Sequence, residues 1–163
     1  MRRREIILVL HNIRSAHNVG SIFRTADAAG VKKIYLCGIT PTPLDRFGRP
    51  RQDLAKVSLG AEKMVAWEYA KSASRLLGNL KKDGYKIFAV EQFPKSTPYH
   101  KFDIKSKKLK AALVFGNEVR GLPPSVLKKA DKILEIPMCG KKESLNVSVA
   151  CGVTLFRLVY SGW

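Results

Sequence analysis

The chain has 163 residues, an ordinary hydrophobic fraction of 45% and a formal net charge of +17, from 30 Lys and Arg against 13 Asp and Glu. This length predicts one domain that buries a core without disulfide or metal staples, and the hydrophobic content excludes a disordered chain. The charge indicates a polyanionic partner. We expect nucleic acid, because no basic amphipathic helix favours anionic lipid.

The cellular compartment is predicted from what the sequence does not contain. No segment approaches the ~20 apolar residues of a membrane span, and the apolar run after the basic N-terminus is too short for a signal peptide. Cys37, Cys139 and Cys151 form no CxxC pair, so we expect three small core residues in a reducing compartment and no metal site. The sequence predicts a cytoplasmic protein.

Short apolar runs alternate with helical patterns along the chain. This order predicts an α/β fold, a mostly parallel sheet with helices on both faces. The first run, 5–11, does not alternate and is expected to be buried on both faces. Strands are expected at 5–11, 32–38, 63–70, 86–92, 110–118 and 131–138. Helices are expected at 21–29, 72–84, 123–130 and from Leu145 onward.

Two basic segments, 38–56 and 93–110, are predicted to connect these elements without regular structure of their own. The first is rich in Pro, Gly and Arg and is too long for an ordinary connection in a compact domain. We therefore interpret 38–56 as a functional loop. Gly30 is expected to end the first helix in the left-handed conformation.

Sequence motifs of the common nucleotide-binding folds are absent. Neither GxGxxG nor GxxxxGK[ST] occurs, which argues against a standard dinucleotide fold and a P-loop enzyme. Three polar clusters instead follow predicted strands, and ligands of open α/β sheets bind beyond the carboxyl ends of the strands.

The first cluster lies between the first strand and the first helix. A helix that opens at Asn18 to Gly20 would present free N–H groups to an anion, and Arg24 would add a guanidinium one turn later. The structural alternative is an N-cap asparagine followed by a solvated arginine. His11 and His17 are either acid–base groups or, more commonly, hydrogen-bonded structural residues.

The second cluster follows the strand at 110–118. Gly116 and Gly121 would let the backbone approach a flat ligand closely. Glu118, in an apolar setting, would need a partner such as Arg120 or an amide at the start of the next helix. Its structural alternative is a carboxylate that favours the dipole at a helix entry.

The third cluster opens the last helix. Ser144 as the N-cap is a sufficient structural explanation for that residue. Asn146 lies two positions later in an otherwise apolar pattern, so it indicates a functional side chain.

Together the clusters resemble the motifs of the SpoU (TrmH-like) branch of the SPOUT RNA 2′-O-ribose methyltransferases. NxGxxxR is matched by Asn18, Gly20 and Arg24. FGxExxGL is matched by Phe115 to Leu122, and SLNVSxA by Ser144 to Ala150. The resemblance covers about 6–158, and its three motifs occur in the family's order and spacing.

The resemblance implies a fold and a cofactor. The fold has a C-terminal deep trefoil knot, which general topology rules would not suggest. We expect a single domain, 1–163, with no separate RNA-binding extension. The cofactor is S-adenosyl-L-methionine. It is expected to contact Val90, Gly116, Ile136, Ser144 and Leu145.

The resemblance also implies a homodimer that methylates a ribose 2′-hydroxyl of RNA. The last helix and the first-motif helix would pair, and Arg24 of one subunit would reach the site of the other. Because arginine is not readily deprotonated, Arg24 would bind a phosphate and polarise the hydroxyl. Asn18 would orient Arg24, Asn146 would position the ribose, and Glu118 would brace the cofactor loop. Ser144 is also expected to belong to the catalytic site, and no metal is expected there.

RNA recognition is expected from the basic loops at 44–56 and 95–110, with Arg46, Arg49 and Arg51 as RNA-binding residues. The substrate stays open between tRNA and rRNA. Two other functions remain as alternatives: a knotted RNA-binding protein without catalysis, and a methyltransferase that acts on a base. The intact residues of all three motifs argue against the first, and base-modifying relatives carry different motifs.

Overall fold

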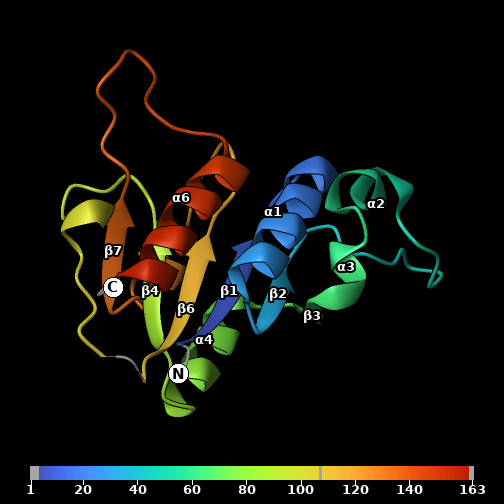
Figure 1. The fold of residues 1–163 in the computed structure, drawn as a ribbon, viewed down its shortest axis with the longest axis horizontal. Coiled ribbons are helices and arrows are strands. Elements are labelled where there is room, and N and C mark those ends of the chain that lie inside the picture. The colour runs from blue at the N-terminus through green and yellow to red at the C-terminus, as the bar shows by residue number, and fades with distance from the viewer. Residues whose placement is uncertain (1–3, 107, 162–163) are drawn as a thin grey trace.

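The computed structural model describes residues 4–106 and 108–161 (Figure 1). The described residues form a seven-stranded sheet with the order β3-β2-β1-β6-β4-β7-β5. All of its strand pairs are parallel. The strands are β1 Glu5–His11, β2 Lys33–Cys37, β3 Ala66–Ala70, β4 Lys86–Val90, β5 Thr97–Pro98, β6 Lys110–Phe115 and β7 Lys132–Glu135. The six predicted strands are confirmed, the first with the predicted bounds and the other five with shorter ones, and β5 is an addition.

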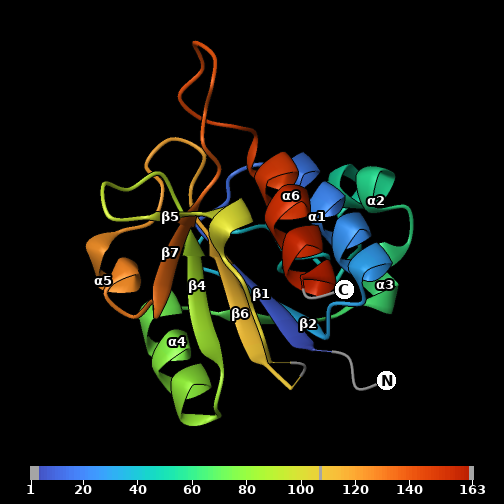
Figure 2. The ribbon, with the colours of Figure 1, turned by 60° about the vertical axis from the view of Figure 1, so that its left-hand side comes forward.

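Helices cover both faces of this sheet, as predicted. They are α1 Ala16–Ala29, α2 Gln52–Ser58, α3 Ala61–Met64, α4 Ala73–Lys82, α5 Pro124–Leu127 and α6 Val147–Tyr160, with a 3-10 turn at Tyr99–Lys101. Figure 2 shows α4 and α5 on one side of the sheet and α1, α2, α3 and α6 on the other. None of the helices in the described part of the chain has the length and apolar character that crossing a bilayer requires.

The central strand β1 has two buried faces, which explains its continuous apolar run. Leu8 and Leu10 belong to the core beneath α1 and α6. Ile7 and Val9 alternate with them and belong to the core beneath α4 and α5. Because successive side chains of a strand point to opposite faces, a strand between two helical layers needs apolar residues at every position.

Helix α1 begins earlier than predicted, so the expected anion site at its start is wrong. Ser15 is the N-cap, and its Oγ accepts a hydrogen bond from the backbone N–H of Asn18 at 3.1 Å. The N–H of Val19 donates to the carbonyl of Ser15 at 3.1 Å. Amides from Asn18 onward are therefore used inside the helix. The predicted left-handed cap at Gly30 is confirmed, with φ of 71°.

Helix α2 replaces the last residues of the predicted loop 38–56. Helix α3 replaces the first residues of the strand predicted at 63–70. Gly20 of α1 lies against α2: a Cβ atom added there would be 2.6 Å from the carbonyl oxygen of Leu54. The glycine of the first motif is therefore explained by close packing of α1 on α2.

The described residues of the second connector, 91–106 and 108–109, include several that contact the C-terminal part of α6. Arg157 of α6 donates a hydrogen bond to the carbonyl of His100 at 3.0 Å. Arg4 donates from one nitrogen to the carbonyl of Ile104 at 2.6 Å, and from another to that of Leu158 at 2.6 Å. These contacts tie the connector, the start of the chain and the end of α6 together.

The N-cap of α6 is Asn146, so the prediction of Ser144 as the cap is wrong. The Oδ1 atom of Asn146 accepts a hydrogen bond from the backbone N–H of Ser148 at 2.9 Å. Both serine and asparagine are favourable caps, so the residue types alone do not decide between them.

Candidate functional site

A cavity of about 550 Å³ opens at the carboxyl ends of β4, β6 and β7. Its volume lies within the range of small-molecule sites. The chain between β7 and α6, which contributes Met138 and Glu143 to the cavity, rises beyond the strand ends in Figure 1. All five residues predicted to bind the cofactor line this cavity: Val90, Gly116, Ile136, Ser144 and Leu145.

The loop 116–122 forms one wall of the cavity, and its two glycines permit the loop's own shape. A Cβ atom added to Gly116 would lie 2.6 Å from the carbonyl carbon of Gly121. Gly121 has φ of 65°, and a Cβ atom there would collide with the carboxylate of Glu91. The prediction attributed these glycines to a bound ligand. In the structure, Gly116 is already required by the close backbone of Gly121, and Gly121 by its left-handed φ and the nearby Glu91 carboxylate.

Two polar residues directly after β4 hold the neighbouring loops, and the sequence analysis missed both. The carboxylate of Glu91 accepts a hydrogen bond from the backbone N–H of Leu122 at 2.8 Å. Gln92 donates from its side-chain amide to the carbonyl of Ile136 at 2.8 Å. Both side chains line the cavity. Their position at the carboxyl end of a predicted strand was the signal that could have identified them.

Glu118 binds the start of α1, so its predicted partners are wrong. Its carboxylate accepts hydrogen bonds from the backbone N–H groups of Arg14 at 3.0 Å and Ser15 at 3.2 Å. It also accepts one from the side-chain amide of Asn18 at 3.2 Å. Neither Arg120 nor the next helix supplies these donors, and Glu118 is exposed rather than in an apolar setting. A carboxylate at this helix end is also favoured by the dipole.

The protonation of Glu118 follows from these contacts. Loss of some hydration raises the pKa of the carboxyl, but hydrogen bonds from Arg14, Asn18 and Ser15 outweigh this and hold the pKa below its usual range. Glu118 is therefore ionised at neutral pH and acts as an acceptor.

Asn18 connects the three motifs into one chain of hydrogen bonds. Its side-chain oxygen accepts from the side-chain amide of Asn146 at 3.1 Å, while its own amide donates to Glu118. The predicted contact from Asn18 to Arg24 is not made within the chain. Six residues separate them, which is about 9 Å along the helix and a different face.

Arg24 lies on the solvent side of α1. Its side chain is exposed and makes no hydrogen bond or ion pair with the described residues. It does not line the cavity. The opposite side of α1, with Val19, Ile22 and Phe23, is buried. Within one chain, the predicted catalytic arginine and the cofactor cavity are thus separate.

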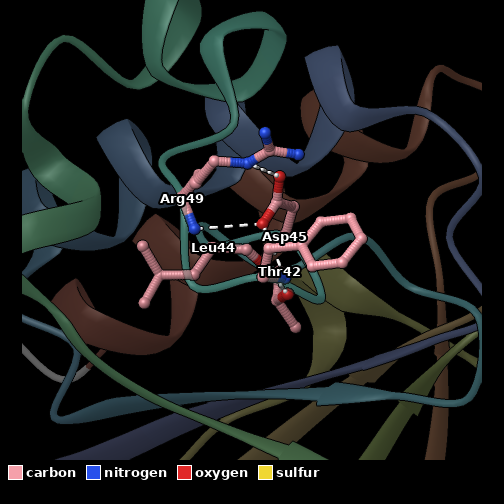
Figure 3. A network of polar contacts seen from close by, with 5 residues as sticks. Thr42, Leu44, Asp45 and Arg49 are labelled. Atoms are coloured by element: carbon pink, nitrogen blue, oxygen red, sulfur yellow. Dashed lines mark hydrogen bonds and ion pairs between the residues drawn. The ribbon is translucent and has the colours of Figure 1, made fainter.

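The arginines predicted to bind RNA lie in and beside a tight turn before α2. Arg46 and Arg49 are exposed, whereas Arg51 is half-buried and is the N-cap residue of α2. Figure 3 shows the guanidinium of Arg49 beside the carboxylate of Asp45, an ion pair of 3.0 Å.

Histidines and cysteines contribute no further cluster to the cavity. His11 is half-buried at the end of β1, and burial lowers its pKa; His17 is exposed. Cys37 and Cys151 are buried as predicted, but Cys139 is exposed because it lies in the segment between β7 and α6. In the described ranges, no group of three or more His, Cys, Asp and Glu side chains is arranged to hold a metal ion.

The arrangement of the cavity and motifs agrees with comparisons to known proteins. Residues 5–156 match the model of the SpoU rRNA Methylase family. The chain belongs to that family. This SpoU-family chain is 31% identical, over 96% of its own residues, to a tRNA (guanosine(18)-2′-O)-methyltransferase of Aquifex aeolicus.

Solved structures support the same family. An rRNA methyltransferase from Sinorhizobium meliloti with bound AdoMet is 29% identical over 95% of this chain, with a TM-score of 0.81. A structure described as giving insight into the 2-OH methylation of C/U34 on tRNA is 28% identical over 94%, with a TM-score of 0.76. The family members differ in length. This chain spans 69% of the Aquifex protein, 56% of the Sinorhizobium chain and 93% of the third. It spans 57–60% of seven further curated relatives.

Proposed function

We propose that this SpoU-family protein transfers a methyl group from S-adenosyl-L-methionine to a ribose 2′-hydroxyl of tRNA or rRNA. One observation carries the proposal. The five predicted cofactor residues converge on one cavity, and two residues of the hydrogen-bonded chain Glu118–Asn18–Asn146, namely Glu118 and Asn146, line it.

The cavity fits an adenosine-containing cofactor in size and chemistry. Its lining combines apolar side chains, such as Val90, Ile136 and Leu145, with backbone of the loops at 116–122 and 136–146. Apolar surface suits a flat base, and a few placed polar groups fix its orientation. When bound, the cofactor supplies a sulfonium methyl group that is a good electrophile for an aligned hydroxyl.

The residues around the cavity have separate tasks in this function. Glu118 holds the start of α1 against the loop 116–122, and this contact keeps the first two motifs together. Asn146 fixes the start of α6 through its oxygen and binds Asn18 through its nitrogen. We assign Asn146 and Ser144 to the ribose side of the site. Preorganised polar groups of this kind avoid reorganisation during the reaction.

Arg24 completes the site in a homodimer. Its position outside the cavity of its own chain supports a role in the cavity of a second copy. The adjacent helices α1 and α6 offer one continuous surface for pairing, on which Val149 and Phe156 are exposed. A two-fold interface places the same surface of both copies in contact. The guanidinium then binds the phosphate beside the target ribose and polarises the hydroxyl.

The trefoil knot belongs to this proposal as well. After β4 the chain runs to β5 at the sheet edge and returns to β6, passing over α6 on the way. We infer that the last segment, from β7 to α6, passes through the loop that this return makes. These contacts support a threaded C-terminus.

RNA binding is assigned to the same single domain. The basic loops 44–56 and 95–110 are its proposed contacts, and the cytoplasm is the proposed compartment, where tRNA and rRNA occur. tRNA is the first substrate to test, because the solved relative that this chain matches over 93% of its length is concerned with tRNA.

Two measurements on the purified chain test the proposal. Calorimetry should show binding of S-adenosylhomocysteine that persists in the presence of a metal chelator. Incubation with labelled S-adenosyl-L-methionine and unmodified tRNA or ribosomal RNA should then yield 2′-O-methylated nucleosides, identified by mass spectrometry after digestion.

Each alternative function has its own outcome in these measurements. RNA binding without any binding of the cofactor product would identify a knotted RNA-binding protein. Methylated bases without methylated riboses would identify a base methyltransferase.

A further inference from the structure

The turn between β2 and α2 is held rigid by Asp45. Its Oδ1 atom accepts hydrogen bonds from the backbone N–H groups of Phe47 at 2.8 Å and Arg49 at 3.0 Å. Its backbone carbonyl accepts from Gly48 at 2.9 Å. An antiparallel bridge between Leu44 and Pro50 closes the turn. Figure 3 shows the contacts between Asp45 and Arg49 as dashed lines.

The carboxylate of Asp45 is occupied by its own turn. The hydrogen bond from the backbone of Arg49 is the main cause of a lowered pKa, and those from Phe47 and the Arg49 side chain act in the same direction against partial desolvation. Asp45 is therefore ionised. One of its oxygens binds the backbone of the turn, and the other, Oδ2, accepts a hydrogen bond from Nε of Arg49 at 3.0 Å. The negative charge of Asp45 is thus used within the turn, and the exposed guanidinium of Arg46 remains available at the surface of the loop.

The tip of this turn presents an aromatic ring, that of Phe47, with the guanidinium groups of Arg46 and Arg49 beside it. The Arg46 guanidinium carbon lies 4.7 Å from the centroid of the Phe47 ring, and that of Arg49 lies 4.9 Å from it. Both distances are those of cation–π contacts. Phe47 nevertheless keeps 65% of its surface exposed, so the ring retains room for a further contact.

Among the described residues, Phe47 differs from the other exposed apolar side chains in having two guanidinium groups beside its ring. Arg46 is exposed, and the ion pair of Arg49 uses one nitrogen, so both guanidiniums keep donors for phosphate oxygens. Nucleobases stack on aromatic rings and on guanidinium planes, while adjacent phosphates bind the cations. The chemistry of the cluster thus matches an unpaired nucleotide.

We propose that Arg46, Phe47 and Arg49 form a stacking platform for an unpaired base of the RNA substrate. The charge of +17 on the chain favours RNA over a protein or lipid partner for this surface. The proposal rests on the proposed function in one respect only, namely that the substrate is RNA. It adds a base-dependent contact to recognition that otherwise depends on phosphate charge.

The test compares two single-stranded probes with equal numbers of phosphates: an oligoadenylate and an abasic ribose-phosphate oligomer. The wild-type protein should bind the oligoadenylate more tightly, because only that probe offers a base. Stacking of one base is worth a factor of roughly 5–150 in affinity. Phe47→Leu keeps an apolar side chain but removes the ring, so it should lose most of this difference.

Matched variants separate stacking from other effects. Phe47→Trp should keep or raise the preference for the oligoadenylate, and Met64→Ala, a truncation at another exposed apolar residue, should leave it unchanged. Circular dichroism of each variant should match the wild type, since Phe47 is not part of the core.

Two results would overturn the platform. One is equal wild-type affinity for both probes. The other is a change in oligomeric state on Phe47→Leu, measured by sedimentation, which would make the turn a contact between protein chains. If the wild-type protein prefers the oligoadenylate but transfers no methyl group to RNA, the proposed function is contradicted and the platform stands.

Discussion

Single charged side chains in this protein are used in two opposite ways. Glu118 is satisfied by hydrogen bonds within the chain, while Arg24 projects from α1 without a partner among the described residues. A residue of the first kind contributes to the fold. A residue of the second kind can be changed with little structural cost, so its contribution to activity can be measured cleanly.

Arg24→Ala should reduce methyl transfer by about 10²–10³, the usual cost of one preorganised charged contact to a transition state. Arg24→Lys should restore little, because a point charge does not reproduce the planar fork. Single-turnover rates with saturating RNA would measure the effect.

The control for this experiment is Arg75→Ala, which removes an exposed arginine of α4 on the other face of the sheet. It should retain the wild-type rate. All variants should bind S-adenosylhomocysteine equally, and an undiminished rate in Arg24→Ala would remove this residue from the mechanism.

Glu118 should make stability depend on acidic pH. Its pKa is lowered in the folded protein, so the unfolded chain binds more protons and stability rises with pH. The contribution is complete above the unfolded pKa of about 4.3 and disappears as pH falls through the lower, folded pKa.

The variant Glu118→Gln should therefore be less stable than the wild type by roughly 1 kcal/mol at neutral pH, a modest value because the carboxylate is exposed. Urea unfolding at several pH values would show the difference shrinking below about pH 4.3. A difference that stays constant down to the lowest pH would mean that the charge of Glu118 does not matter.

At the scale of elements, the segments that follow β4, β6 and β7 form one site. Hydrogen bonds and one close approach of backbone at a glycine hold these segments together. The loop after β6 touches its own backbone at Gly116 and Gly121, while Glu91 after β4 holds the N–H of Leu122. The cavity is shaped by these contacts rather than by the sheet alone, and the loop has no spare volume at Gly116.

Gly116→Ala should lower the free energy of unfolding by about 1–3 kcal/mol, because its Cβ atom would overlap the carbonyl carbon of Gly121. It should also weaken binding of S-adenosylhomocysteine, since both glycines line the cavity. Urea unfolding and calorimetry would measure the two effects.

Gly140→Ala is the matched control, because a Cβ atom added at Gly140 meets nothing within 4 Å. It should be neutral in stability. If both alanine variants behaved alike, the loop would have to be more adaptable than the close approach at Gly116 indicates.

At the scale of the whole molecule, the proposed dimer explains why the motifs are only partly assembled in one chain. The second and third motifs meet Asn18 beside the cavity, but Arg24 faces away from it. In the proposed dimer, the second copy supplies this guanidinium.

Mixing two inactive variants would test this arrangement. Subunits with Arg24→Ala and subunits with Asn146→Ser should regain activity together, because one of the two sites in a mixed dimer then has both native residues. Serine is chosen because it still caps α6. Verified heterodimers without any recovered activity would place Arg24 and Asn146 of the same chain in one site.

The sequence by itself determined the class of fold and the family, and it indicated residues that line the cavity. Apolar runs such as 5–11 identify strands buried on both faces, and the glycine and polar residues after them lie at one sheet edge because parallel strands end together. These are properties of local pattern. The resemblance to the SpoU family, which rests on three such motifs, predicted the five residues from 90 to 145 that line the cavity.

Only the tertiary structure decided which partner each polar side chain has. Ser15 rather than Asn18 caps α1, Asn146 rather than Ser144 caps α6, and Glu118 binds residues about a hundred positions away. Several donors near each of these groups satisfy the same local rule. The choice among them depends on distances set by the packing of whole elements, which no short stretch of sequence contains.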